Sequence, residues 1–272
     1  MPASPPPQPP QPRSPPESQP PLVAPPSPPP AGWREPVFAF GVVTAIAAAL
    51  FWTARVVPVL HHNLNAAIAV LFFYAPVVAG RVVGRRFDFR DAGLTLQPLR
   101  TNAAVLGLAL AVTFPLFVIG FFVFYGVVCG PAASSGVGAL LGRMCPGGWQ
   151  GLGGGHLRLP ASFALIAANQ ILVVALPEEI FFRGYLLQRL DAWRPPRRRL
   201  LGAPIGAGLL LSAVLFALGH VLVDFNPQRL AVFFPALIFG WLRARTGSLA
   251  AGIGFHAGCN LLADVLHTSY FR

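Results

Sequence analysis

Several ionisable and amide side chains lie within otherwise apolar stretches of the C-terminal part of the chain, where lipid or packed helices would penalise them. They form three groups, each of which has members four residues apart. On a helix, residues four apart share one face, so each group presents a small polar patch to one side. The groups are Glu178-Glu179-x-x-x-Arg183, Phe216-x-x-x-His220 and His256-x-x-x-Asn260.

These residue types could together carry out hydrolysis. Glu179 and Arg183 can form an ion pair across one helical turn, whereas Glu178 is rotated by about 100° around the helix and is left free. A free carboxylate, two histidines and an amide supply a general base, a group that polarises water and donors for an oxyanion. We therefore predict that the three groups converge on one water molecule.

Each group taken alone also has a structural explanation. The Glu179–Arg183 pair could tie one helix to its neighbours, and His220 could cap a helix end. The last group, His256 and Asn260, could form interhelical hydrogen bonds. Their occurrence together on three different helices favours a hydrolytic site, because ionisable groups in a membrane helix are costly and usually have a role.

The composition indicates that membrane-spanning helices position these residues. Of the 272 residues, 54% are hydrophobic and only 11% are charged, whereas soluble domains carry about 25% charged residues. This excludes an ordinary soluble enzyme. All 20 basic residues are arginines that lie in short groups between apolar runs, so the net charge of +11 does not indicate a nucleic-acid partner. We expect an all-α, polytopic bundle embedded in the lipid bilayer.

Seven segments have the length and composition of a membrane span, which takes about 20 mostly apolar residues. We expect Pro177 to bend or divide the fourth, which is long for one crossing. A fifth span that began at residue 203 would place His220 about 10 Å deeper than Glu178, so we expect it to begin after an interfacial 200–207 segment or to tilt strongly. The predicted spans are residues 37–57, 65–83, 103–128, 162–190, 203–223, 229–244 and 248–266.

The arginine-rich links indicate the topology. Links at residues 81–100, 189–199 and 243–247 carry most of the arginines between the spans, and alternation of the spans places all three on one side. Because positively charged links remain in the cytoplasm, we predict a cytoplasmic N-terminus. The arginine-only, Ala-, Gly- and Pro-rich composition hints at a GC-rich bacterial genome, so we expect an integral protein of the bacterial inner membrane.

We divide the chain into four regions. Residues 1–35 are predicted to be a disordered cytoplasmic tail, because 16 of the 30 prolines lie in residues 1–32; such a tail could bind an unknown partner. The other regions are N-terminal transmembrane helices at 36–128, a Gly-rich extracytoplasmic loop at 129–159 and a transmembrane core with the polar groups at 160–268.

The Gly-rich loop contains two cysteines, Cys129 and Cys145. If the loop lies outside the cytoplasm, the two thiols could form a disulfide. Two unpaired cysteines in a flexible loop are the alternative, and the sequence does not separate them.

In their order and in their placement on late spans, the three groups resemble the motifs of the CPBP family. These are the CAAX-protease and bacteriocin-processing intramembrane endopeptidases. The sequence around the first group, EEIFFRGYLLQRL, is close to the usual sequence of the family at this motif. The turn at 245–248 resembles the link between the last two motifs of the family. The resemblance covers about residues 160–266.

The resemblance implies an endopeptidase that cuts a membrane-associated protein or peptide at or inside the membrane. Carried over by position, Glu178 activates the water, supported by Glu179 with Arg183. His220 binds and polarises the water, and the two residues of the last group stabilise the oxyanion. CAAX-like processing or the removal of a C-terminal sorting tag are the implied reactions.

The sequence leaves two forms of this chemistry open. Glu178, His220 and His256 would also make a catalytic zinc set, with water as the fourth ligand. The chain lacks the HExxH spacing of helical zinc sites, and we favour metal-free glutamic catalysis, without a cofactor, over a zinc enzyme.

Two other functions would use the same features. A proton- or ion-coupled transporter would use the Glu, Arg and His cluster as an ion path, and its flux would depend on Glu178 without peptide cleavage. A non-catalytic scaffold would act through the proline-rich tail, so deletion of residues 1–32 would abolish its function.

Overall fold

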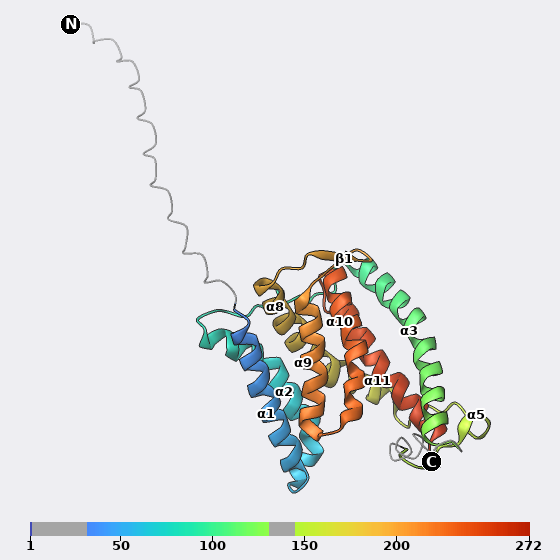
Figure 1. Ribbon diagram of the computed structural model, residues 1–272. Helices are drawn as coiled ribbons and strands as arrows, with labels where there is room; N and C mark the ends of the chain where they lie inside the picture. The colour runs from blue at the N-terminus through green and yellow to red at the C-terminus, as the bar shows by residue number, and fades with distance from the viewer. Residues whose placement is uncertain (2–31, 131–144) are drawn as a thin grey trace. The chain divides into compact units, whose positions relative to one another are not determined.

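The computed structural model describes Met1, residues 32–130 and residues 145–272 (Figure 1). The predicted proline-rich tail and much of the Gly-rich loop therefore lie outside the described residues. The chain from residue 32 onward is predominantly helical where it is described, as the sequence predicts.

Three long apolar helices form the N-terminal part. In α1, α2 and α3, most side chains are valine, leucine, alanine or phenylalanine, as expected for helices in lipid. Pro58 opens α2 at a position where its missing N–H is not needed. Helix α1 packs against α2 and α9, and α3 packs against α10 and α11. Their bounds are Arg34–Ala54, Pro58–Val82 and Leu99–Val128.

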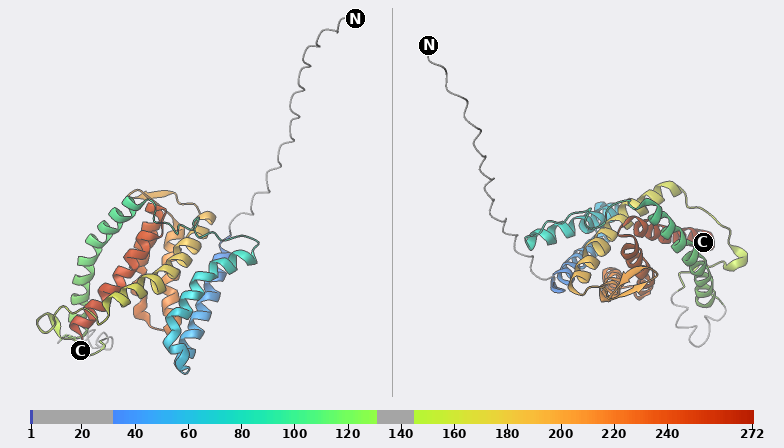
Figure 2. Two further views of the ribbon diagram at one scale, coloured as in Figure 1. Left: turned by 180° about the vertical axis from the view of Figure 1, so that it is seen from behind. Right: turned by 90° about the horizontal axis from the view of Figure 1, so that it is seen from above.

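One continuous helix of changing pitch carries the first polar group. It lies between α2 and α11, as Figure 2 shows from behind. Pro177 neither divides nor ends this helix. The expectation that it could divide the span is therefore corrected. Wider π-type turns precede and follow the segment with Pro177, and such turns accommodate irregular hydrogen bonding and are frequent at functional sites. Its segments are α6 (Phe163–Asn169), η2 (Gln170–Ala175), α7 (Leu176–Glu179), η3 (Ile180–Leu187) and α8 (Gln188–Trp193).

A short antiparallel hairpin separates this helix from the next one, an element that an all-α prediction did not include. Its strands pair through Arg198↔Ile205 and Leu200↔Ala203. The hairpin delays the start of α9 to Ala207. The later start removes much of the depth difference between His220 and Glu178 that a span from residue 203 would cause. The strands are β1 (Arg198–Leu200) and β2 (Ala203–Ile205), and α9 spans Ala207–Asp224.

Two further helices complete the C-terminal core. Helices α9, α10 and α11 pack in sequence, with α10 between the other two (Figure 1). Buried aromatic and aliphatic side chains of η3, α9, α10 and α11 form the centre of the hydrophobic core. The remaining elements are α5 (Gly151–Gly154), η4 (Pro227–Val232), α10 (Phe233–Thr246) and α11 (Ala250–Tyr270).

Five helices among the described residues are long and apolar enough to cross a membrane. They coincide with the first five predicted spans, which agrees with an integral membrane protein. Helix α10 has only 14 residues, fewer than the roughly 20 of a straight crossing, and α11 carries several polar residues. The five are α1, α2, α3, the helix Phe163–Trp193 and α9.

The three arginine-rich links lie together at one end of the helices. Glu35, at the start of α1, pairs with Arg189 at 2.5 Å and with Arg85 at 3.5 Å. The N–H of Leu249 donates to the carbonyl of Gly93 at 2.8 Å, which joins the first link to the last. The indole N–H of Trp241 donates to a carbonyl of the hairpin at 3.0 Å. We call this the arginine-rich end.

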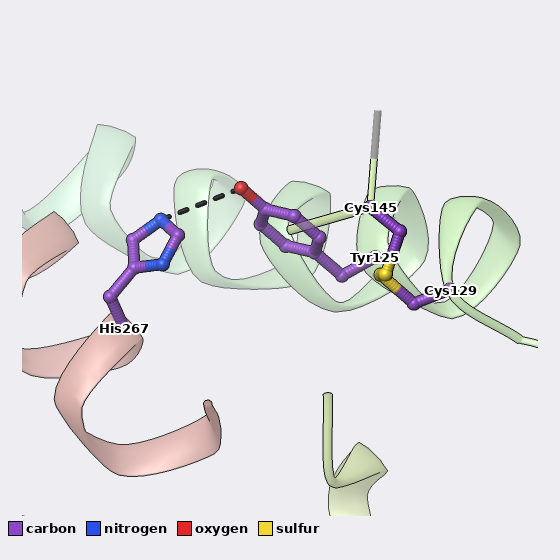
Figure 3. The surroundings of a disulfide bond; sticks show 4 residues. All are labelled: Tyr125, Cys129, Cys145 and His267. Atoms are coloured by element: carbon purple, nitrogen blue, oxygen red, sulfur yellow. Dashed lines mark hydrogen bonds between the residues drawn. A yellow bond between two sulfur atoms is a disulfide. The ribbon is translucent and has the colours of Figure 1, made fainter. Parts of the chain in front are cut away.

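The other end of α3 and α11 is held by a disulfide and aromatic rings. Cys129 and Cys145 are bonded, with their Cα atoms 5.3 Å apart, which decides between the two alternatives that the sequence left open. Close to this bond, the Tyr125 hydroxyl and His267 Nε2 lie 3.4 Å apart and link α3 to α11 (Figure 3). The rings of Phe271 and Tyr125 pack edge to face nearby.

Candidate active site

Glu179 is the centre of a buried polar cluster. Its side chain is completely buried, and one oxygen, Oε1, accepts from Arg183 Nη1 at 3.0 Å and from His256 Nδ1 at 3.1 Å. The helical spacing that predicted the Glu179–Arg183 pair is therefore realised. The contact with His256 joins the first polar group to the third, from helices 77 residues apart in sequence.

Arg183 is an almost fully buried cation that neighbouring groups hold in place. Its second terminal nitrogen donates to the backbone carbonyl of Ala236 at 3.2 Å. The guanidinium carbon lies 4.4 Å from the ring centre of Phe216 and 4.7 Å from that of Phe239. Aromatic faces attract a cation in a desolvated site, so Arg183 is stabilised by more than one carboxylate.

His256 connects the two glutamates. Its ring stacks on Phe239 at 4.7 Å with an interplanar angle of 14°. Nδ1 bonds to Glu179, and Nε2 lies 3.8 Å from Oε2 of Glu178. That separation is too long for a direct hydrogen bond. A carboxylate oxygen only accepts, so Nδ1 carries the proton that bonds to Glu179, and Nε2 faces Glu178.

Glu178 has different surroundings from Glu179. Its side chain is 14% exposed, whereas that of Glu179 is completely buried. The Oε2 atoms of both glutamates lack a hydrogen-bond partner among the described residues. It lines a cavity of about 250 Å³ between α1, α2, α7 and α9. His220 lines the same cavity, so the structure brings the first and second polar groups to one space.

His220 is fixed by the helix that carries it. Its Nδ1 lies 2.9 Å from the backbone carbonyl of Phe216. Because a carbonyl only accepts, Nδ1 must donate, and Nε2 is left with a lone pair in the neutral ring. The ring of Phe216 packs against His220 at 4.5 Å and against His256 at 5.9 Å. This gives the phenylalanine one turn before His220 a role in holding both histidines.

Asn260 is less closely associated with the other site residues. Its amide donates to Gln170 Oε1 at 2.9 Å, and the Gln170 amide in turn donates to Asp264 at 3.3 Å. Neither Asn260 nor His256 is among the residues that line the Glu178 cavity. Asn260 follows His256 by one turn on α11, so both occupy the same side of that helix. The contacts of Asn260 with Gln170 therefore join α11 to η2.

Two further residues of the site were missed in the sequence. Phe239 lies against both Arg183 and His256. At Gly252, a Cβ atom would lie 3.1 Å from Glu179 Oε2, so a glycine lets α11 approach the carboxylate closely. A glycine one turn before His256 on the same helix was the available signal, but an isolated glycine in an apolar helix does not identify such a role.

The described side chains do not show the grouping expected for the alternative zinc set. Among the described residues, no three His, Cys, Asp or Glu side chains are grouped so that they could hold a metal ion. Glu178 and His256 approach each other, but the His220 side chain does not complete a set with them. We therefore derive no catalytic step that uses a metal.

The fold and the cluster together define a helical membrane protein with paired carboxylates beside two histidines. The model of the family described as Rce1-like, type II CAAX prenyl endopeptidase Rce1-like, matches residues 160–262. The match includes all three polar groups and confirms the resemblance to the CPBP family. It implies a membrane-embedded protease. No curated protein and no solved structure matches the chain.

Proposed function

We propose that the protein is an intramembrane endopeptidase in which Glu178 activates the attacking water. The observation that carries this proposal is the different engagement of two adjacent carboxylates. Glu179 is bonded to Arg183 and His256, whereas Glu178 lines a cavity that His220 also lines. The match to an endopeptidase family over the same residues supports the reaction class.

In the proposed reaction, Glu178 takes a proton from water while the water oxygen attacks the carbonyl carbon of the peptide bond. His220 accepts a hydrogen bond from the water through Nε2 and so orients it. His256, protonated on both ring nitrogens, donates from Nε2–H to the oxyanion of the tetrahedral intermediate, and the second amide hydrogen of Asn260 donates to it as well. When the C–N bond breaks, Glu178 returns its proton to the amine nitrogen, so protons balance over the cycle.

Glu179 and Arg183 act as positioning residues in this scheme. The Glu179 carboxylate accepts from Nδ1–H of His256, stabilises the protonated ring and directs Nε2 toward the reacting centre. Arg183 compensates the buried charge of Glu179. In this scheme, Glu178 is the free base, and Glu179 holds the imidazole of His256 in a fixed position.

The cavity also suggests the side from which substrate enters. Its lining includes Phe51 near the end of α1, Leu64 near the start of α2, and Asp224 at the end of α9. These positions lie at the end of the helices remote from the arginine-rich end. If the arginine-rich end is cytoplasmic, the cavity receives substrate from the extracytoplasmic side. A membrane-anchored protein with its cleavage site near that surface is the proposed substrate, as in removal of a C-terminal sorting tag.

The direct test compares the membrane proteome of cells that express the wild type with that of cells that express Glu178→Ala. Proteins that retain uncut termini only with the variant would identify the substrates. An identical set of termini in both cell lines would contradict the proposal.

Chelation tests the metal-free form of the reaction. We expect purified enzyme to retain its cleavage rate after thorough treatment with a chelator, because Glu178 and the histidines do not need a metal in this scheme. The Glu178→Gln variant should be inactive under the same conditions. Loss of wild-type activity on chelation, with recovery on addition of zinc, would contradict the metal-free form.

A further inference from the structure

The hairpin between α8 and α9 has an unusual turn. Leu201 and Gly202 form its tip, and both have positive φ angles, 48° and 82°. Turns of this type favour asparagine, aspartate or glycine, because other side chains are strained there. Leu201 is also 78% exposed, and its neighbour Leu200 is 52% exposed. The hairpin thus presents two large apolar side chains where polar residues are usual.

Four arginines lie on or just before the same hairpin. None of them has an ion pair with an acidic group in the part of the chain that the structure describes. Arg194 stacks over the ring of Trp193 with its guanidinium carbon 5.0 Å from the ring centre. This concentration of positive charge has no counterion within the described protein. The four are Arg194, Arg197, Arg198 and Arg199.

A cavity of about 680 Å³ lies where α8, the hairpin and the start of α9 meet. Its lining has two chemical characters. Three of the arginines contribute to the basic part, and aromatic and aliphatic residues contribute to the apolar part. The basic residues are Arg194, Arg197 and Arg198, and the apolar ones include Trp193, Ile205 and Leu210.

The position of this cavity relative to the membrane follows from its flanking helices. The hairpin connects the helix Phe163–Trp193 to α9, and both are candidate membrane spans. A link between two spans must lie at a membrane surface. Trp193 is at the end of its helix, where tryptophan is enriched at the level of the lipid headgroups.

We propose that this cavity binds the headgroup of an anionic phospholipid. The arginines contact the phosphate diester, and the apolar lining together with the leucines at the hairpin tip contacts the beginning of the acyl chains. A nucleic acid or an acidic soluble protein would use the arginines but would leave these apolar residues in water. The combination of basic and apolar groups therefore favours lipid.

The bound lipid would occupy a site separate from the Glu178 cavity. The two cavities share no lining residue, and the lipid site lies at the arginine-rich end, whereas the catalytic cavity leads toward the other end. The proposal therefore does not depend on endopeptidase activity, and its test uses a binding measurement.

The test measures binding of dioleoyl phosphatidylglycerol and dioleoyl phosphatidylcholine to purified full-length protein in a neutral detergent by native mass spectrometry. We expect the wild type to prefer phosphatidylglycerol. The triple variant Arg194→Gln/Arg197→Gln/Arg198→Gln should bind phosphatidylglycerol roughly a hundredfold more weakly, since each arginine at a lipid surface contributes about fivefold. Unchanged affinity in this variant would overturn the proposal.

A matched variant separates this site from general attraction to positive charge. Arg81, Arg90 and Arg100 are exposed arginines that do not line the cavity, and their replacement by glutamine removes the same charge. We expect this control variant to keep most of the wild-type affinity for phosphatidylglycerol. An equal loss in both variants would overturn a specific site.

A second pair of measurements tests lipid as the ligand. Leu200→Ser/Leu201→Asn removes the apolar tip, suits the turn and keeps every arginine, and we expect it to weaken phosphatidylglycerol binding severalfold. Inorganic phosphate at the lipid concentration should not compete. Unaltered lipid affinity in the leucine variant, or full competition by inorganic phosphate, would overturn a phospholipid and indicate a simple anion site. Displacement by a short oligonucleotide at equal concentration would likewise overturn it.

Discussion

The two glutamates next to His256 have different surroundings. On the Nδ1 side, Glu179 is buried, bonded to Arg183 and closely approached by α11 at Gly252. On the Nε2 side, Glu178 is partly exposed and lines a cavity that His220 also lines. Adjacent residues on a helix point about 100° apart. This rotation places the Glu179 carboxylate in a packed interface and the Glu178 carboxylate at a cavity. The comparison suggests that the first is structural and the second chemical.

The sharpest test of the comparison is Glu178→Gln, which keeps the size of the side chain and removes the base. We expect cleavage of a membrane substrate to fall by about 10²- to 10⁴-fold, the usual contribution of a general base. The thermal unfolding temperature in detergent should stay close to that of the wild type, because Glu178 Oε2 has no hydrogen bond to lose among the described residues. A variant that keeps its activity would remove Glu178 from the chemistry.

The other side of the comparison is tested by Arg183→Met. Removal of the cation leaves the Glu179 carboxylate buried without charge compensation, which typically costs about 3–5 kcal/mol. We expect a large fall in the unfolding temperature and a loss of active protein. The double variant Glu179→Gln/Arg183→Met should recover part of that stability, since no uncompensated charge remains. If Arg183→Met is as stable as the wild type, the ion pair does not have the structural role assigned to it.

His220→Asn separates the two nitrogens of this ring. The asparagine amide can still donate to the carbonyl of Phe216, but Nε2 is lost, so we expect a folded protein with activity lower by about 10²-fold. His62→Asn is the matched control, because His62 Nδ1 makes the same contact, 2.7 Å from the carbonyl of Pro58, on an exposed surface. Equal rates for both variants and the wild type in the peptide assay would show that His220 only supports its helix.

The smallest expected effect is that of Gly252→Ala. The added methyl group would lie 3.1 Å from Glu179 Oε2, so α11 or the carboxylate must shift. Overpacking of this kind costs about 1–3 kcal/mol. We expect a modest decrease in unfolding temperature and a severalfold decrease in activity as His256 moves with α11. Gly41→Ala is the matched control, because Gly41 also lies within an apolar helix but has open space around its Cβ position. The same decrease in both variants would point to helix geometry and not to the Glu179 contact.

The spacing of residues along the sequence was sufficient to predict several parts of the structure. The i,i+4 spacing predicted the pair of Glu179 with Arg183, and the apolar runs predicted the first five spans, with ends that differ from the helix ends by up to seven residues. The distribution of arginines predicted that three distant links share one end. These features depend on local periodicity or on the alternation of spans, and both can be read without knowledge of helix packing.

Other parts required the folded chain. The short hairpin at 198–205 could not be inferred from an arginine-rich link, and it sets the start of α9. The hydrogen bond from His256 to Glu179 depends on how closely α11 approaches α7, and the bond from Asn260 to Gln170 depends on the packing of α11 against η2. Neither distance is encoded in residue spacing, because the contacts join segments from different helices.

The sequence by itself determined the kinds of groups available for hydrolysis and the apolar helices that carry them, because composition and helical periodicity are local properties. Only the tertiary structure decided that His256 bonds to Glu179, that Glu178 lines a cavity with His220, and that Cys129 is joined to Cys145. The physical reason is that these contacts depend on the distances and rotations between packed helices, which arise from the summed side-chain packing of the whole bundle.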